Sequence, residues 1–249
     1  MTPVRQSQEP EGVAAILPIQ QSVAGSAGSF LVAADDGNRY WCKPLNNRQS
    51  PRVPATEQIV GRLGALIDAP VCEVELVALD GIAGFEFTPG RLAEPGWAHG
   101  SLAVDPALEI RDLANRSDDD NRRRHAGIFA LHDWLAGSDV QWLYAVDQDN
   151  AYYSHDHGFY LTGPDWTDLT LAAATAQDFS LPMDAAGLDG PELERLAERL
   201  DALSKEQIEA AVSGIPSTWP VGEGELQAVA DFADSRRASV AARLRGLVP

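Results

Sequence analysis

The chain has 249 residues, with 37 acidic and 19 basic side chains, so its formal net charge is −18. Hydrophobic residues make up 45% and charged residues 22%, which is the composition of a folded globular protein rather than a disordered one. The acidic excess argues against a nucleic-acid binder, which needs a basic face, and against attachment to an anionic membrane. It does not exclude a small polyanionic ligand, because such a ligand responds to the charge of its own site.

The cysteines and the N-terminal residues indicate the cellular compartment of the protein. Cys42 and Cys72 lack a CxxC spacing, which indicates free thiols in a reducing compartment. The N-terminal sequence MTPVRQSQEPEG is polar and lacks the pattern of a signal peptide. We therefore expect a cytoplasmic protein without a membrane segment.

The first third of the chain predicts a compact β-rich unit with one helix. Alternating apolar residues and an Asp-Asp-Gly-Asn turn indicate strands and a hairpin, and an apolar stripe at helical spacing follows Pro54. The predicted elements are strands Val13–Gln20, Phe30–Ala34 and Arg39–Leu45, a helix from Pro54 to Ile67, and a strand Val71–Leu79.

Between Phe85 and Asp105 the sequence contains three Pro-Gly or His-Gly breaks, which indicate an irregular linker between two lobes. We expect an α+β, bilobal chain, with a β-rich N-terminal lobe over residues 1–90 and a mainly helical C-terminal lobe over residues 91–249. In the second lobe the predicted elements are a helix Arg122–Leu135, strands Trp142–Val146 and Ala151–Ser154, and helices Pro191–Leu203, Lys205–Val212 and Glu225–Leu247.

A glycine-containing turn, a lysine and a glutamate follow one another in the N-terminal lobe. Phosphate binding needs backbone N–H groups that can be approached closely, which glycine permits, and a mobile cation held by an acid. Each feature alone is also typical of an ordinary turn or a solvated side chain, but their order favours a phosphate site. The residues are Gly25, Ser26, Gly28 and Ser29 in the turn, Lys43 on a strand and Glu57 on the helix.

Two aspartates in the second lobe stand where a chemical role is expected. Asp139 follows a helix, and Asp156 comes directly after the strand Ala151–Ser154, ahead of Gly158. One aspartate on a loop and another at a strand end before glycine is how kinase-like sites hold a base and a metal ligand.

A rival interpretation uses the same segment for metal-dependent hydrolysis. His155, Asp156 and His157, together with His132 and Asp133, have the side chains that bind transition metals. Neighbouring residues on a strand point to opposite faces, however, so these side chains could share a metal only outside regular structure.

These motifs resemble those of the HipA-family kinases, in particular a group of short stand-alone bacterial HipA-like proteins. The resemblance covers roughly residues 12–165, and its most specific parts are the segments LHDWLAGSD, ending at Asp139, and SHDHGFY, containing Asp156. It implies a bilobal protein-kinase-like fold, also related to phosphoinositide kinases, and ATP-dependent phosphorylation of Ser or Thr on a protein.

The resemblance also implies a role for each residue. Lys43 would pair with the nucleotide phosphates, and Glu57 would brace Lys43. Asp139 would be the catalytic base, Asp156 would hold Mg²⁺, and the turn at residues 25–29 would lie over the phosphates.

One position departs from the kinase pattern. A metal-binding Asn is expected five residues after the catalytic Asp, and here that position is Tyr144. Gln141 would then be the second metal ligand, or no residue would replace the Asn.

The leading hypothesis is a Ser/Thr kinase that uses ATP and Mg²⁺ on a protein substrate, with a regulatory partner protein. The alternative is a pseudokinase, which would bind nucleotide or act as a scaffold without phosphate transfer.

Overall fold

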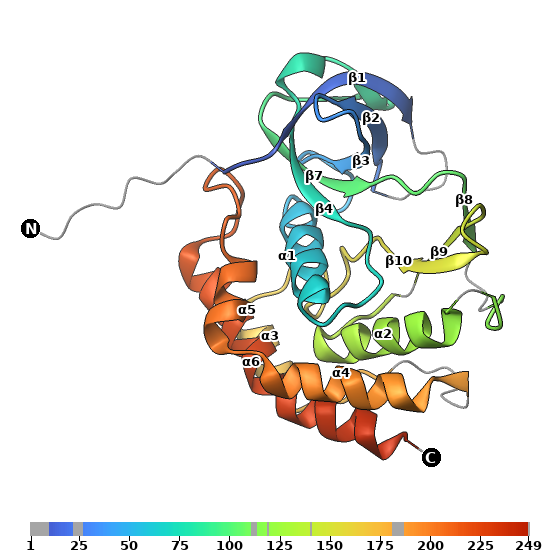
Figure 1. The fold of residues 1–249 in the computed structure, drawn as a ribbon. Coiled ribbons are helices and arrows are strands. Elements are labelled where there is room, and N and C mark those ends of the chain that lie inside the picture. The colour runs from blue at the N-terminus through green and yellow to red at the C-terminus, as the bar shows by residue number, and fades with distance from the viewer. Residues whose placement is uncertain are drawn as a thin grey trace, which may run out of the picture.

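The computed structural model describes residues 10–21, 27–110, 114–118, 120–139, 141–180 and 187–248. They form the expected α+β fold with two lobes, one built from strands and the other mainly from helices (Figure 1). Among these residues, no helix is both long and apolar enough to cross a bilayer. Cys42 and Cys72 are buried free thiols, which confirms the prediction that they are not paired.

The N-terminal lobe is a closed five-stranded barrel with the strand order β1–β2–β3–β7–β4, in which β1 pairs in parallel with β4. A short hairpin, β5–β6, and a 3-10 turn, η1, are inserted between β4 and β7. The bounds are β1 Val13–Gln21, β2 Phe30–Ala34, β3 Arg39–Lys43, α1 Val53–Leu66, β4 Val74–Ala78, η1 Asp80–Ile82, β5 Glu86–Thr88, β6 Arg91–Leu92 and β7 Trp97–Leu102.

The prediction of an irregular linker over residues 85–105 is wrong, because β7 lies in the middle of the barrel between β3 and β4. Its sequence, WAHGSL, does not alternate in the usual way. Gly100 is required there because a Cβ at this position would collide with the side chain of Val77. A boundary at residue 90 would cut β7 from its sheet, and we therefore propose that the N-terminal lobe extends to Leu102.

In its described residues, the C-terminal lobe has five helices and a three-stranded sheet with the order β10–β9–β8. The helix α6 packs against α2, α3, α4 and α5. The bounds are β8 Ala107–Ile110, α2 Asn121–Trp134, β9 Trp142–Ala145, β10 Ala151–Ser154, α3 Asp168–Ala174, α4 Gly190–Ala202, α5 Lys205–Val212 and α6 Glu223–Gly246. Six of these elements confirm predictions to within two residues, whereas β8 and α3 are too short to give a periodic pattern.

Helix α1 connects the two lobes. Its apolar face, which includes Ile59 and Leu63, belongs to the same buried cluster as Leu131 and Trp134 of α2. Tight packing of this kind fixes the position of a helix along its length. Glu57, on the same helix, is therefore held at a defined place between the barrel and the helices.

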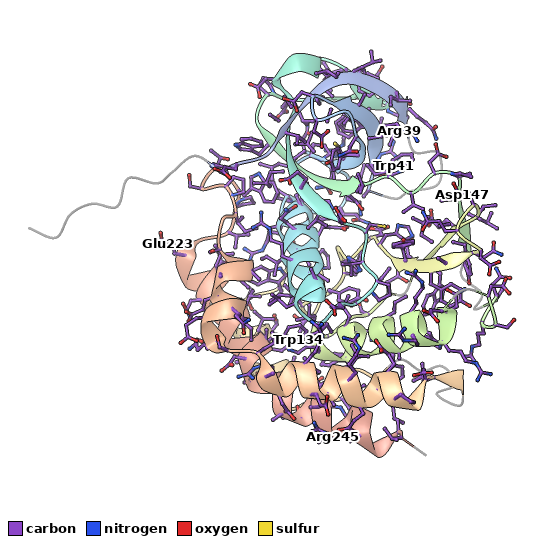
Figure 2. All side chains as sticks on the ribbon, in the orientation of Figure 1. Arg39, Trp41, Trp134, Asp147, Glu223 and Arg245 are labelled. Atoms are coloured by element: carbon purple, nitrogen blue, oxygen red, sulfur yellow. The ribbon has the colours of Figure 1, made fainter. Side chains whose placement is uncertain are left out.

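The helical lobe is organised around a buried arginine. The side chain of Arg236 on α6 is fully buried and forms an ion pair with Asp133, 3.1 Å from Nη2 to Oδ1. It also donates to the main-chain oxygen of Trp134, whose indole donates in turn to the carbonyl of Ala233. Trp134 lies among the helices of the C-terminal lobe (Figure 2). Arg243 occupies the other oxygen of Asp133 at 2.7 Å.

Arg236→Met is expected to lower the free energy of unfolding by about 3 kcal/mol or more, because it removes one partner of a buried ion pair and the donor for several carbonyls. Urea denaturation measures the change. The control is Arg245→Met, which removes exposed ion pairs to Glu194 and Asp201 and should change the free energy of unfolding far less, because solvent screens exposed ion pairs. Equal losses in the two variants would contradict the organising role of Arg236.

Candidate active site

Lys43 stands at the centre of the site. It ends β3, and its Nζ forms ion pairs with Glu57 of α1 and with Asp156, which follows β10. The side chains of Lys43 and Glu57 are buried, whereas that of Asp156 keeps 22% of its surface exposed. One cation from the barrel thus meets two carboxylates, one from α1 and one from the other lobe.

The chain bends sharply at Asp156. This residue has φ = +56°, in the left-handed region, which aspartate tolerates better than most residues. Two positions later, a Cβ on Gly158 would lie 2.8 Å from Val53 Cγ1 and 3.3 Å from Glu57 Oε1. The SHDHG segment can therefore approach α1 only with glycine at this position.

Gln141 joins the two aspartates that the sequence singled out. Its Nε2 donates to Oδ2 of Asp156 at 3.0 Å and to Oδ2 of Asp139 over a long 3.4 Å. The loop carrying Asp139 is tied to the segment after Asp156, because Ser138 Oγ donates to the carbonyl of Phe159 at 2.7 Å. Asp139, Gln141 and Asp156 thus lie together, on the side of Asp156 away from Lys43.

Tyr144, reached by counting five residues from Asp139, lies inside β9 rather than in this cluster. Its side chain is buried against Tyr152, and its hydroxyl accepts from the N–H of Ala114 at 3.1 Å. The amide side chain that precedes the strand and reaches Asp156 belongs to Gln141. Counting five residues from Asp139 therefore leads to a buried residue inside β9, and Gln141 is the amide that contacts Asp156.

Glu57 is held by a second set of contacts that sequence reasoning missed. Its Oε2 accepts from the backbone N–H of His157 at 3.0 Å, and Nε2 of His99 on β7 lies 3.7 Å from the same oxygen. His157 is itself fixed by Ser154, with 2.8 Å between Nε2 and Oγ. A histidine in the middle of a strand gives no sequence signal of such a role.

Burial and the shared cation set the charges of this cluster. Burial raises the pKa of Glu57 to about 7, although Lys43 acts in the opposite direction. Burial opposes the charged forms of Lys43 and Asp156, yet their mutual attraction prevails, so the pKa of Lys43 lies above its usual range and that of Asp156 below it. Lys43 and Asp156 are therefore both charged at neutral pH.

The structure describes only part of the predicted glycine turn, since Gly25 and Ser26 lie outside the described residues. Gly28 has φ = +75°, and a Cβ there would lie 3.4 Å from Thr88 of β5. The neighbouring Ala27 accepts from the backbone N–H of Arg48 at 3.1 Å, while Ser29 leads directly into β2. The described end of the turn is thus anchored to the β5–β6 hairpin and to the chain after β3.

The structure does not form the metal site that the hydrolase interpretation predicted. Within the described parts of the chain, no group of three or more His, Cys, Asp or Glu side chains is arranged to hold a metal ion. Both carboxylate oxygens of Asp133 are taken by arginines. His132 bonds through Nδ1 to the carbonyl of Phe179, and His157 bonds to Ser154.

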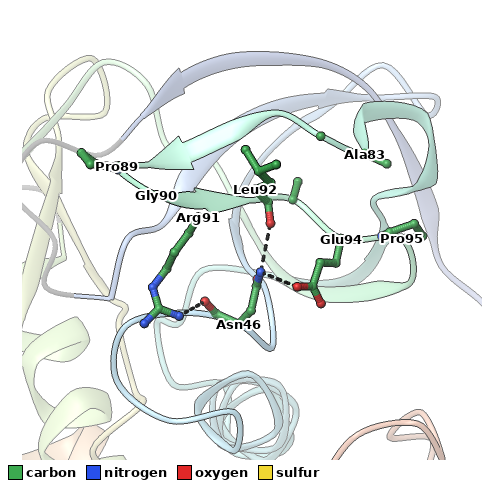
Figure 3. A pocket seen from close by; sticks show the side chains of 10 residues that line it. Asn46, Ala83, Pro89, Gly90, Arg91, Leu92, Glu94 and Pro95 are labelled. Atoms are coloured by element: carbon green, nitrogen blue, oxygen red, sulfur yellow. Dashed lines mark hydrogen bonds between the residues drawn. The ribbon is translucent and has the colours of Figure 1, made fainter.

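A cavity of about 680 Å³ lies beside the β5–β6 hairpin (Figure 3), and none of its lining residues is a candidate site residue. Its polar groups largely bond to one another. Asn46 donates to the carbonyl of Leu92 at 2.9 Å and to Glu94 at 3.1 Å, and Arg91 donates to the carbonyl of Asn46 at 2.7 Å. The arrangement supports the hairpin and brings no candidate catalytic group together.

Solved structures show what this architecture is similar to. A proinflammatory kinase of Helicobacter pylori, CtkA, aligns with 96% of this chain and 99% of its own at 12% identity, with a TM-score of 0.59. The Golgi casein kinase aligns with 97% of this chain and 72% of its own at 10% identity and a TM-score of 0.51. The chain has a kinase fold. The fold expected from the resemblance to HipA-like kinases is thereby confirmed.

The HipA protein of Shewanella oneidensis MR-1, solved with HipB and operator DNA, aligns with all of this chain and 68% of its own at 14% identity and a TM-score of 0.42. No family model and no curated protein matches the sequence.

The raised pKa of Glu57 predicts a pH-dependent stability. Between about pH 4.5 and 7 the folded protein keeps a proton on Glu57 that the unfolded chain has lost, so this group's contribution to stability falls as pH rises. Glu57→Gln removes the titration. The free energy of unfolding of the wild type minus that of the variant should fall between pH 5 and 7, by up to about 1.4 kcal/mol per pH unit, and level off above pH 8. Urea denaturation across this range measures it, and a constant difference would contradict the assignment.

Proposed function

We propose that the protein is an ATP-dependent Ser/Thr protein kinase that uses Mg²⁺. The observation that carries the proposal is the convergence of Lys43, Glu57 and Asp156, contributed by β3, α1 and the segment after β10 of a kinase fold. Phosphate transfer requires a cation braced for the phosphates and a carboxylate for the metal, which these residues supply.

The donor set next to Lys43 fits a hard divalent cation. Carboxylate and amide oxygens are the ligands that Mg²⁺ prefers, and Asp156 and Gln141 are already in contact at 3.0 Å. In the proposed site Asp156 and Gln141 hold the metal, Gln141 after turning its amide oxygen toward it. Bound Mg²⁺ would neutralise phosphate charge.

The remaining roles follow from position. Lys43 binds the nucleotide phosphates and Glu57 orients Lys43. Asp139 accepts the proton of the substrate hydroxyl, and the turn containing Gly25, Ser26, Gly28 and Ser29 covers the phosphates. Support for a nucleotide and a divalent ion comes from the Golgi casein kinase, which has been solved with Mn/ADP bound. The phosphate acceptor is a protein hydroxyl, and a regulatory partner protein belongs to the same proposal.

A pseudokinase is the second candidate. It is favoured by the fact that both oxygens of Asp156 already have partners in the described structure, Lys43 on one and Gln141 on the other. A protein that keeps this arrangement in the presence of nucleotide would not assemble a metal site. Phosphate transfer distinguishes the two functions.

A thermal-shift titration with ATP, with and without Mg²⁺ or Mn²⁺, tests nucleotide binding. Binding to the folded state alone adds about 2.7 kcal/mol at a hundredfold excess over Kd. Lys43→Ala should reduce the shift with ATP, and Asp156→Asn should abolish its metal-dependent part. The matched control Asp147→Asn, in the exposed turn between β9 and β10, should behave as wild type.

Transfer of radiolabelled phosphate from ATP to the protein itself or to lysate proteins completes the test. Transfer that is lost in Asp139→Asn supports the kinase. A thermal shift without transfer supports a nucleotide-binding pseudokinase, and no shift with any nucleotide contradicts the kinase.

A further inference from the structure

His99 is a buried histidine to which the proposed reaction has given no role. It lies on β7, where it is only 2% exposed, and its backbone pairs with that of Lys43 across the β3–β7 ladder. Cross-strand partners of this kind project their side chains from the same face of a sheet. His99 and Lys43 therefore share the inner face, and α1 presents Glu57 to one nitrogen of the imidazole and Gln58 to the other.

Gln58 determines which nitrogen of His99 carries the proton. The amide satisfies all its neighbours in one orientation, assigned from the hydrogen-bond network. In that orientation its NH₂ group donates to Nδ1 of His99 at 2.9 Å and to the carbonyl of Glu75 at 3.3 Å, and its oxygen accepts from Arg62 at 3.2 Å. Because Nδ1 accepts, the proton of a neutral ring lies on Nε2.

The Nε2–H group is directed at Glu57. Nε2 lies 3.7 Å from Oε2, which is longer than a hydrogen bond, so the group acts on the carboxylate as a nearby dipole. Burial lowers the pKa of His99 well below its usual range, which keeps the ring neutral. A neutral donor stabilises Glu57 without competing with Lys43 as a second cation would.

The two oxygens of Glu57 are thus divided between different partners. Oε2 faces the backbone N–H of His157 and the ring of His99, and Oε1 is left for Lys43. This division fixes the direction of the carboxylate even when Lys43 exchanges Asp156 for another partner.

We propose that His99 is a positioning residue, whose Nε2–H group orients Glu57 so that Glu57 holds Lys43 in place for the nucleotide phosphates. The inference rests on the proposed function, because it presumes that Lys43 meets a nucleotide.

Two substitutions at His99 separate this role from mere packing. The amide nitrogen of glutamine reaches about as far as Nε2 of histidine, and that of asparagine reaches only as far as Nδ1. His99→Gln should therefore keep the Kd for Mg·ATP within about threefold of wild type. His99→Asn should weaken it by more than about threefold, because the dipole that faces the carboxylate of Glu57 is lost. Calorimetric titration gives both values, and urea denaturation checks that the two variants are comparably stable.

A measurement without nucleotide tests the same geometry. Nitrogen-15 NMR of the wild-type imidazole should show a neutral ring protonated at Nε2. Protonation at Nδ1, or equal weakening of Mg·ATP binding by the two substitutions, would overturn the role of His99. If the wild type still binds Mg·ATP, the proposed function is unaffected by that result. A wild type that fails to bind Mg·ATP would overturn the proposed function, and the role of His99 with it.

Discussion

The candidate site depends on one buried lysine that faces two carboxylates. Lys43 comes from the barrel, Glu57 from the helix that joins the lobes, and Asp156 from the sheet of the helical lobe, so its ion pairs hold three separately packed parts together. Buried charges are costly unless they are paired and hydrogen-bonded. The close approach at Gly158, the left-handed backbone at Asp156 and the donors around Glu57 all serve to bring these charges into contact.

The cluster contains two carboxylates, Glu57 and Asp156, but one cation, Lys43. This excess of one carboxylate suits Asp156 to exchange Lys43 for a metal ion. In the described structure Lys43 and Gln141 occupy the oxygens of Asp156, and a divalent cation would take over that position and free Lys43 for phosphates. The net charge of −18 is compatible with this account, because the binding of a triphosphate depends on the local charges and on the metal. If the proposed function holds, the same balance predicts strict dependence on a divalent cation.

Much of the fold followed from the sequence, because long amphipathic helices and alternating strands carry their own periodicity. The strand β7 could not be predicted in this way. His99, which faces Glu57, and Gly100, whose place leaves no room for a Cβ beside Val77, interrupt its apolar pattern. The order of Lys43, Glu57, Asp139 and Asp156 along the chain was sufficient to name them as candidates, and the structure brings Lys43, Glu57 and Asp156 into contact. Counting five residues from Asp139 reached Tyr144 inside β9 and not Gln141, which contacts Asp156. His99 faces Glu57 through a tertiary contact that no local pattern records.

The most direct test of the exchange at Asp156 is a crystal structure of the protein with Mn²⁺ and a non-hydrolysable ATP analogue, in which anomalous scattering locates the metal. The account predicts Mn²⁺ bound by Asp156 and Gln141, with Lys43 released from Asp156, still paired with Glu57 and in contact with the phosphates. A structure in which Lys43 remains on Asp156 while the nucleotide and metal bind elsewhere would contradict it.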